Sequence, residues 1–157
     1  MKYFSINEFV VSNTADRLGV NNSPDDMHKI NIMEFINELL DPLREAWGEC
    51  CQQYNWGNPG IKVTSGYRSP ALNKAVGGSN TSSHSIGYAA DLVPSNGRLK
   101  EFKHFCMDWL KNKKFDQFIS EDEHNGVPRW IHIGYKNSAR AQRRQFMSMI
   151  AGKYYNI

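Results

Sequence analysis

Long hydrophobic runs and paired cysteines are both missing from this 157-residue sequence. No stretch of 18 apolar residues occurs, so we expect no membrane insertion. The three cysteines are Cys50, Cys51 and Cys106, and an odd number with two adjacent members indicates neither a disulfide framework nor a Cys-x-x-Cys metal clip. We therefore expect three reduced thiols in or near the core.

A strong charge of one sign is also missing. The net charge of +3 comes from 19 basic and 16 acidic residues, far from the dense basic stripe of a nucleic-acid-binding protein. A short basic segment around Arg140, Arg143 and Arg144 is too small to change that conclusion. The sequence therefore predicts no nucleic-acid partner. A mildly cationic surface is compatible with an anionic bacterial wall, although ordinary solubility is the simpler explanation.

The N-terminal sequence lacks the uninterrupted apolar segment and the small-residue cleavage site of a signal peptide. We therefore expect synthesis in the cytoplasm without such a signal. A length near the commonest domain size, with 40% hydrophobic residues and no linker or repeat, predicts a single domain over residues 1–157. We expect it to be a monomer.

Hydrophobic periodicity predicts a chain that starts with helices and continues with short strands. Ser5 and Glu8 have the spacing of a capping box that begins a first helix. The predicted helices cover residues 5–11, 29–48, 70–76 and 98–112, and the predicted strands cover residues 61–65, 89–93, 115–120 and 130–135. Residues 143–155 fit an edge strand or a helix equally well. The fold class is therefore α+β, with N-terminal helices on a small antiparallel sheet.

Three polar segments stand out, at residues 65–69, 82–91 and 130–132. His84 lies in a polar loop, Asp91 in an apolar strand where an unpaired carboxylate is unfavourable, and His132 in another strand. A catalytic zinc ion takes three ligands of these kinds and keeps one position open. Taken singly, each residue has a more ordinary explanation as a core histidine, a strand-end cap or a polar turn.

In combination, these segments resemble the zinc D-alanyl-D-alanine carboxypeptidases and phage L-alanyl-D-glutamate endopeptidases, which share a hedgehog-like metallopeptidase fold. The Ser-x-His-x-x-Gly-x-Ala-x-Asp motif of that family is matched at every fixed position over residues 82–91. A Ser-Gly-Tyr-Arg-Ser segment occurs at 65–69 and a Trp-x-His segment at 130–132. Three further segments, at residues 4–9, 41–44 and 72–78, resemble the phage-type branch of the family.

The resemblance implies that His84, Asp91 and His132 bind one zinc ion. It also implies that Arg68 holds a substrate carboxylate or the developing oxyanion, for which a planar guanidinium is suited. Ser82 would bind substrate or brace the loop that carries His84. Tyr67, beside Arg68, is a further predicted substrate-binding residue.

The general base is where the sequence departs from the family pattern. Several family members have an acidic residue three positions before the last histidine ligand, and here that position is Arg129. An acid that ends the preceding strand would serve instead. Glu121 is the candidate, and Asp122 and Glu123 are close rivals.

The expected function is therefore zinc-dependent hydrolysis of a peptide bond in the stem peptides of bacterial peptidoglycan, by a carboxypeptidase or an endopeptidase. The protein would reach its substrate in the cell wall after its own release from the cytoplasm, as in phage or prophage lysis. The alternative, which Arg129 keeps open, is an inactive zinc-containing module that binds the wall or forms part of a virion.

Overall fold

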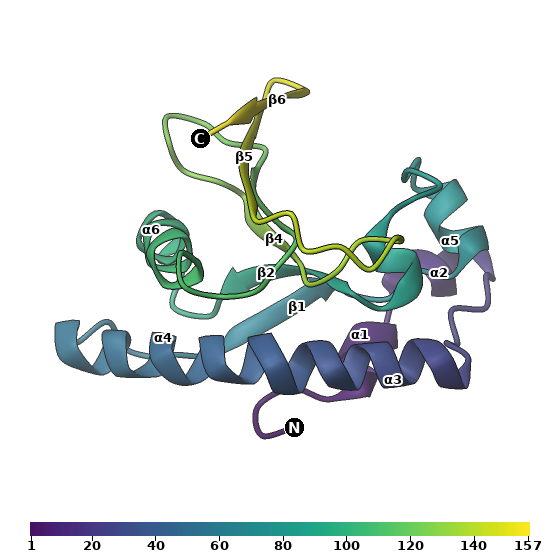
Figure 1. The fold of residues 1–157 in the computed structure, drawn as a ribbon, viewed down its shortest axis with the longest axis horizontal. Coiled ribbons are helices and arrows are strands. Elements are labelled where there is room, and N and C mark those ends of the chain that lie inside the picture. The colour runs from purple at the N-terminus through teal and green to yellow at the C-terminus, as the bar shows by residue number, and fades with distance from the viewer.

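The computed structural model describes all residues from 1 to 157. A sheet lies above one long helical segment, with the remaining helices around its ends (Figure 1). The helices are α1 (Ile6–Val10), α2 (Asn13–Leu18), α3 (Asp26–Phe35), the π-helix η1 (Ile36–Leu40), α4 (Asp41–Tyr54), α5 (Pro70–Ala75), the 3₁₀-helix η2 (Ser83–Ile86) and α6 (Leu99–Leu110). The strands are β1 (Ile61–Ser65), β2 (Ala89–Pro94), β3 (Gln117–Glu121), β4 (Trp130–Gly134), β5 (Gln145–Ile150) and β6 (Lys153–Asn156).

The long helical segment runs through α3, η1 and α4, so the predicted helix over residues 29–48 was too short at both ends. The Asp25 side chain caps its start by accepting a hydrogen bond from the His28 backbone, and Asn55 ends it in a left-handed conformation. Pro42 has no backbone N–H to donate within a helix. The wider turn of η1, in which the Asp41 N–H donates to the Ile36 carbonyl, lets the helix pass this proline without breaking.

The sheet has six strands in the order β1-β2-β4-β3-β5-β6, and every neighbouring pair is antiparallel except β3 and β5. The four predicted strands and the α+β class are confirmed. The C-terminal residues form strands and not a helix: β5 and β6 make a hairpin that rises away from the long helix in Figure 1.

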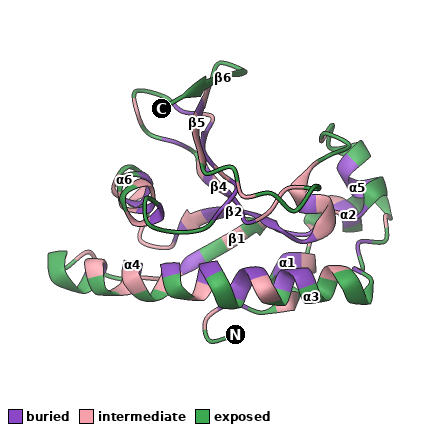
Figure 2. Cartoon of the chain, in the orientation of Figure 1, coloured by how far each residue is buried: buried purple, intermediate pink, exposed green.

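One face of the sheet packs on the helices and holds the core. Leu92, Phe118 and Ile131 on that face are fully buried, together with Phe35 and Trp47 from the long helical segment. Figure 2 shows the buried stripe on the side of this segment that faces the sheet. Burial of these side chains stabilises the sheet, and the other face is left free to carry a site.

All three cysteines are free, and Cys51 and Cys106 are buried, as expected. None of the helices combines the length and the apolar character that a membrane crossing requires.

Candidate metal centre

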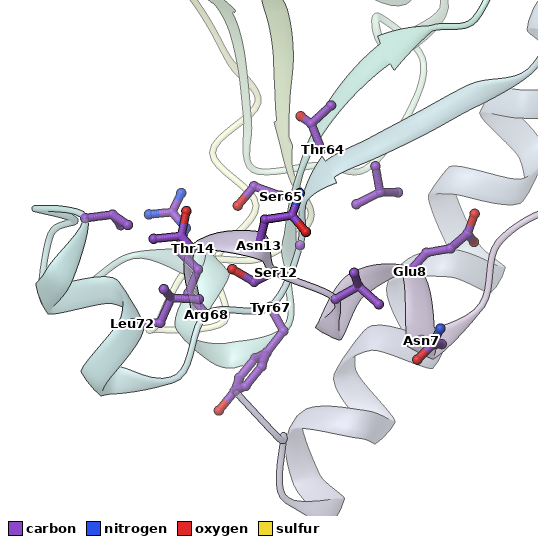
Figure 3. A pocket seen from close by; sticks show the side chains of 14 residues that line it. Asn7, Glu8, Ser12, Asn13, Thr14, Thr64, Ser65, Tyr67, Arg68 and Leu72 are labelled. Carbon is purple, nitrogen blue, oxygen red and sulfur yellow. The ribbon is translucent and has the colours of Figure 1, made fainter. Parts of the chain in front are cut away.

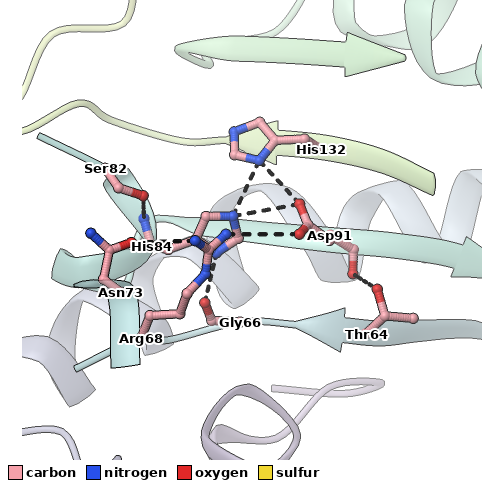
Figure 4. A network of polar contacts seen from close by, with 8 residues as sticks. All are labelled: Thr64, Gly66, Arg68, Asn73, Ser82, His84, Asp91 and His132. Carbon is pink, nitrogen blue, oxygen red and sulfur yellow. Dashed lines mark hydrogen bonds and ion pairs between the residues drawn. The ribbon is translucent and has the colours of Figure 1, made fainter. Parts of the chain in front are cut away.

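Three side chains from separate parts of the chain meet on the open face of the sheet. Asp91 on β2 is paired directly with His132 on β4, so both side chains point to the same face. His84 comes from η2, just before β2. The structure thus brings together the three residues predicted as metal ligands, and Figure 4 shows their side chains pointing toward one another.

The donor atoms of the three residues form a small triangle. Asp91 Oδ1 lies 3.1 Å from His132 Nδ1 and 3.5 Å from His84 Nε2, and the two ring nitrogens are 3.3 Å apart. Metal–ligand bonds of ~2.0–2.2 Å in a tetrahedron place neighbouring donors ~3.3–3.6 Å apart. The spacing therefore fits one zinc ion bound by three protein atoms, and the donor set of two imidazoles and a carboxylate is one that zinc takes.

The protonation of the triad also suits a cation. The other ring nitrogen of His84, Nδ1, lies 2.7 Å from the Gly66 carbonyl oxygen and donates to it, so the lone pair of Nε2 faces the triangle. Burial lowers the pKa of His84, against the opposing effect of Asp91, and so favours the neutral form of this ring. Burial alone would raise the pKa of Asp91, but the two histidines outweigh it and hold the pKa well below its usual value. An ionised carboxylate and a neutral imidazole are the forms that bind metal.

The segment around Gly66 fixes the position of His84. A Cβ atom on Gly66 would lie 2.6 Å from the Phe9 Cα atom, so only glycine allows this approach to α1. The next residue donates its N–H to the Phe9 carbonyl, and the Arg68 N–H donates to the His84 carbonyl. The Ser82 side chain accepts from the His84 N–H at 3.3 Å and begins η2, so it braces this loop.

Arg68 lies beside the triad and is largely buried. Its guanidinium is 4.0 Å from Asp91 Oδ2 and donates to the Asn73 side-chain oxygen at 3.2 Å (Figure 4). Burial lowers the pKa of Arg68, against the opposing effect of Asp91 and Glu121. The side chain remains a cation and is suited to bind a substrate carboxylate or oxyanion.

Glu121 ends β3 on the same face of the sheet as His132. Ile119 pairs with His132 in register, so their side chains lie on the same face of the sheet. Glu121 is two residues further along β3, and the alternation of side chains therefore directs it to that face, toward the triad. Burial raises the pKa of the Glu121 carboxyl; Asp91 adds to this effect, while His132 and Arg68 oppose it.

The two rival acids face elsewhere. Asp122 forms an ion pair with the exposed Arg129, 2.9 Å from its Nε. Glu123 is buried and accepts a hydrogen bond from Lys103 Nζ at 2.8 Å. Neither of them lines the cleft that contains the triad, whereas Glu121 does.

The cleft over the triad is lined by residues from the middle of the chain and from its C-terminal part. Its lining includes the triad, Arg68, Ser82 and Glu121, and it also includes residues that the sequence analysis did not predict for the site, namely Asn137, Ser138, Arg143, Met149 and Tyr154. The last two lie on the C-terminal hairpin. The only signal for them in the sequence is the alternation of side chains along strands whose partners lie far away in the chain.

Tyr67 does not join the triad. Its ring is buried against His28, with 5.4 Å between ring centroids, and it lines a second hollow between the N-terminal helices and β1 (Figure 3). Arg68 lines both hollows, since it stands between them. Of the other histidines, His104 and His124 are exposed, and His28 is half-buried.

A family model described as Peptidase M15 matches residues 2–134. The chain belongs to the peptidase M15 family. M15 peptidases depend on zinc, and the three donors that could hold it here all lie within the matched region. A comparison with curated proteins finds no match for this M15 peptidase.

Proposed function

We propose that this M15 peptidase hydrolyses a peptide bond in the stem peptides of bacterial peptidoglycan, with His84, Asp91 and His132 as the ligands of one zinc ion. The observation that carries the proposal is the triangle of donor atoms, whose edges of 3.1, 3.3 and 3.5 Å fit tetrahedral zinc. The likeness of residues 65–69, 82–91 and 130–132 to the zinc D-alanyl-D-alanine carboxypeptidases and L-alanyl-D-glutamate endopeptidases supports the choice of substrate.

Zinc, when bound, would supply a Lewis acid that polarises the substrate carbonyl and lowers the pKa of water. Glu121 would act as general base: its carboxylate takes a proton from the attacking water and returns it to the leaving nitrogen. The raised pKa of Glu121 suits this role, because a base works best when its pKa approaches the working pH. Arg68 would hold the substrate carboxylate or the developing oxyanion.

The test is to incubate the zinc-loaded protein with intact muropeptides and to identify the products by mass spectrometry. Loss of a single D-Ala identifies a carboxypeptidase, and release between L-Ala and D-Glu identifies an endopeptidase. Either product should vanish after chelation and return when zinc is added back.

The inactive wall-binding module remains the alternative, and the same experiment separates the two. One bound zinc per chain with no cleavage of any muropeptide would favour it. The position of Glu121 in the cleft supports the catalytic alternative. Arg129 occupies the position at which several family members have the general base, and Glu121 supplies an acidic residue in its place.

A further inference from the structure

The C-terminal hairpin of β5 and β6 lies outside the residues that match the family, which end at 134. It nevertheless contributes to the cleft over the triad, through Met149 and Tyr154. Part of the wall around the site is therefore built by a segment to which the family match assigns no role.

Sheet register places Tyr154 on the face that carries the triad. His132 pairs with Ile119, and Ile119 pairs with Met147 on β5, so these side chains share one face. Met149, two residues further along β5, has the same orientation and pairs with Tyr154 on β6.

The neighbouring tyrosine has the opposite orientation. Tyr155 pairs with Ser148, a buried residue that pairs in turn with Ser120 on the other face of the sheet. Tyr155 does not line the cleft. The two tyrosines are adjacent, similar in exposure at 56% and 48%, and differ in the face they occupy.

The hydroxyl of Tyr154 has no hydrogen-bond partner within the chain, whereas that of Tyr88 donates to Glu34. Partial burial raises the pKa of Tyr154, and the negative charges of Glu121 and Asp91 add to this effect. The phenol therefore stays protonated at neutral pH and is available as a donor near both carboxylates.

We propose that Tyr154 binds the substrate, its hydroxyl donating a hydrogen bond to a carbonyl or carboxylate oxygen of the peptide in the cleft. Arg68 follows β1 at one end of the sheet and Tyr154 lies on β6 at the other, so the two side chains hold the peptide from opposite walls. The inference rests on the proposed peptidase function.

The experiment compares Tyr154→Phe with Tyr155→Phe, each of which removes one hydroxyl from the same hairpin. Cleavage kinetics and the Kd for a fluorescent muropeptide are measured for the wild type and both variants, together with zinc content and Tm. We expect Tyr154→Phe to raise KM and Kd roughly three- to tenfold, with kcat changed less than about twofold, because the hydroxyl contributes to binding more than to chemistry. Zinc content and Tm should stay at the wild-type values, and Tyr155→Phe should behave as the wild type.

Equal KM and Kd for the wild type and Tyr154→Phe would overturn the proposal. Tyr154→Ala separates a packing contact from a hydrogen bond: a loss in the alanine variant alone would also overturn it. If the wild type binds muropeptides without cutting them, the proposed catalysis fails while the Kd comparison still tests Tyr154. If the wild type neither binds nor cuts, both proposals fall.

Discussion

Asp91 and His132 face each other across adjacent strands, in direct register, with Oδ1 of one 3.1 Å from Nδ1 of the other. Both side chains are attached to a hydrogen-bonded ladder, so their separation is set by the strand spacing and not by loop conformation. The third donor, His84, comes from a short 3₁₀-helix and depends on the Gly66 carbonyl for its orientation. We therefore expect substitutions outside the triad to disturb His84 more readily than Asp91 or His132.

Replacement of His84 by alanine is expected to remove the bound metal. Residues that only support a ligand change metal affinity by ~10–100-fold, so loss of a ligand should lower it by more than ~100-fold, and activity should fall with it. Zinc content per chain, measured by inductively coupled plasma mass spectrometry after dialysis, checks this outcome. His104→Ala, on the exposed side of α6, is the matched control and should keep its zinc. Full zinc in His84→Ala would remove this residue from the ligand set.

Glu121→Gln should separate catalysis from metal binding. The amide keeps the shape of the side chain but cannot accept the proton, so kcat should fall by ~10²–10⁴-fold while zinc content stays unchanged. Asp122→Asn is the control: it weakens only the surface ion pairs with the exposed Arg129 and His124, and it should keep kcat within about twofold of the wild type. A Glu121→Gln variant as active as the wild type would rule out this general base.

Gly66→Ala is expected to lower both stability and zinc affinity. The new Cβ would lie 2.6 Å from the Phe9 Cα atom and 2.8 Å from its carbonyl oxygen, and backbone cannot move aside as a side chain can. We expect a loss of ~1–3 kcal/mol in the free energy of unfolding, measured by urea denaturation, and weaker zinc binding because the Gly66 carbonyl moves relative to His84.

Gly48→Ala is the control for that substitution. Within helix α4, its Cβ would lie 2.9 Å from the flexible end of Arg44 and at an ordinary contact distance of 3.9 Å from the Pro59 Cβ atom. Alanine is favoured over glycine in a helix by ~1 kcal/mol, so this variant should be as stable as the wild type or more stable. Equal stability of Gly66→Ala and the wild type would contradict the close approach described above.

The buried carboxylate of Glu123 predicts a dependence of stability on pH. Burial alone would raise the pKa of Glu123, but hydrogen bonds from Lys103, Ser120 and Ser148 outweigh it and the pKa is lowered. A group whose pKa is lower in the folded state stabilises the protein above its unfolded pKa of ~4.3 and loses this contribution as the pH falls through the folded value.

Glu123→Gln should therefore lower the free energy of unfolding by ~1–3 kcal/mol at neutral pH, since Lys103 loses its buried partner. The difference from the wild type should shrink as the pH falls below ~4 and through the lowered pKa of the folded protein, where the wild-type carboxyl also becomes protonated. Denaturant melts followed by tryptophan fluorescence check this. Glu101→Gln, which breaks an exposed pair with Arg98, should have little effect at any pH. A difference for Glu123→Gln that is constant with pH would contradict the assignment.

The parts of the fold that were predictable from sequence have local causes. The strand over residues 61–65 alternates, and the capping box of Ser5 and Glu8 forms as expected, because both depend on neighbouring residues. The long helix continues past Pro42 because a π-turn precedes it. This continuation was not predictable from the sequence, since a proline usually indicates the end of a helix. The C-terminal hairpin was ambiguous because its first strand is fixed by parallel pairing with β3, a contact between distant parts of the chain.

The candidate site shows the same division. The motifs indicated His84, Asp91 and His132, and the structure brings them together. Tyr67 follows the same motif but its ring turns toward His28, because neighbours on an extended segment point to opposite sides. Tyr154 had no motif to mark it, and only the register of the finished sheet places it in the cleft.

The strand order also separates the donor triangle from part of the cleft wall. β1, β2, β3 and β4 contain or support all three donors, and they pair with one another without β5 or β6. The register that aligns Asp91 with His132 therefore does not depend on the hairpin. The hairpin brings Tyr154 to the cleft only through the pairing of β5 with β3.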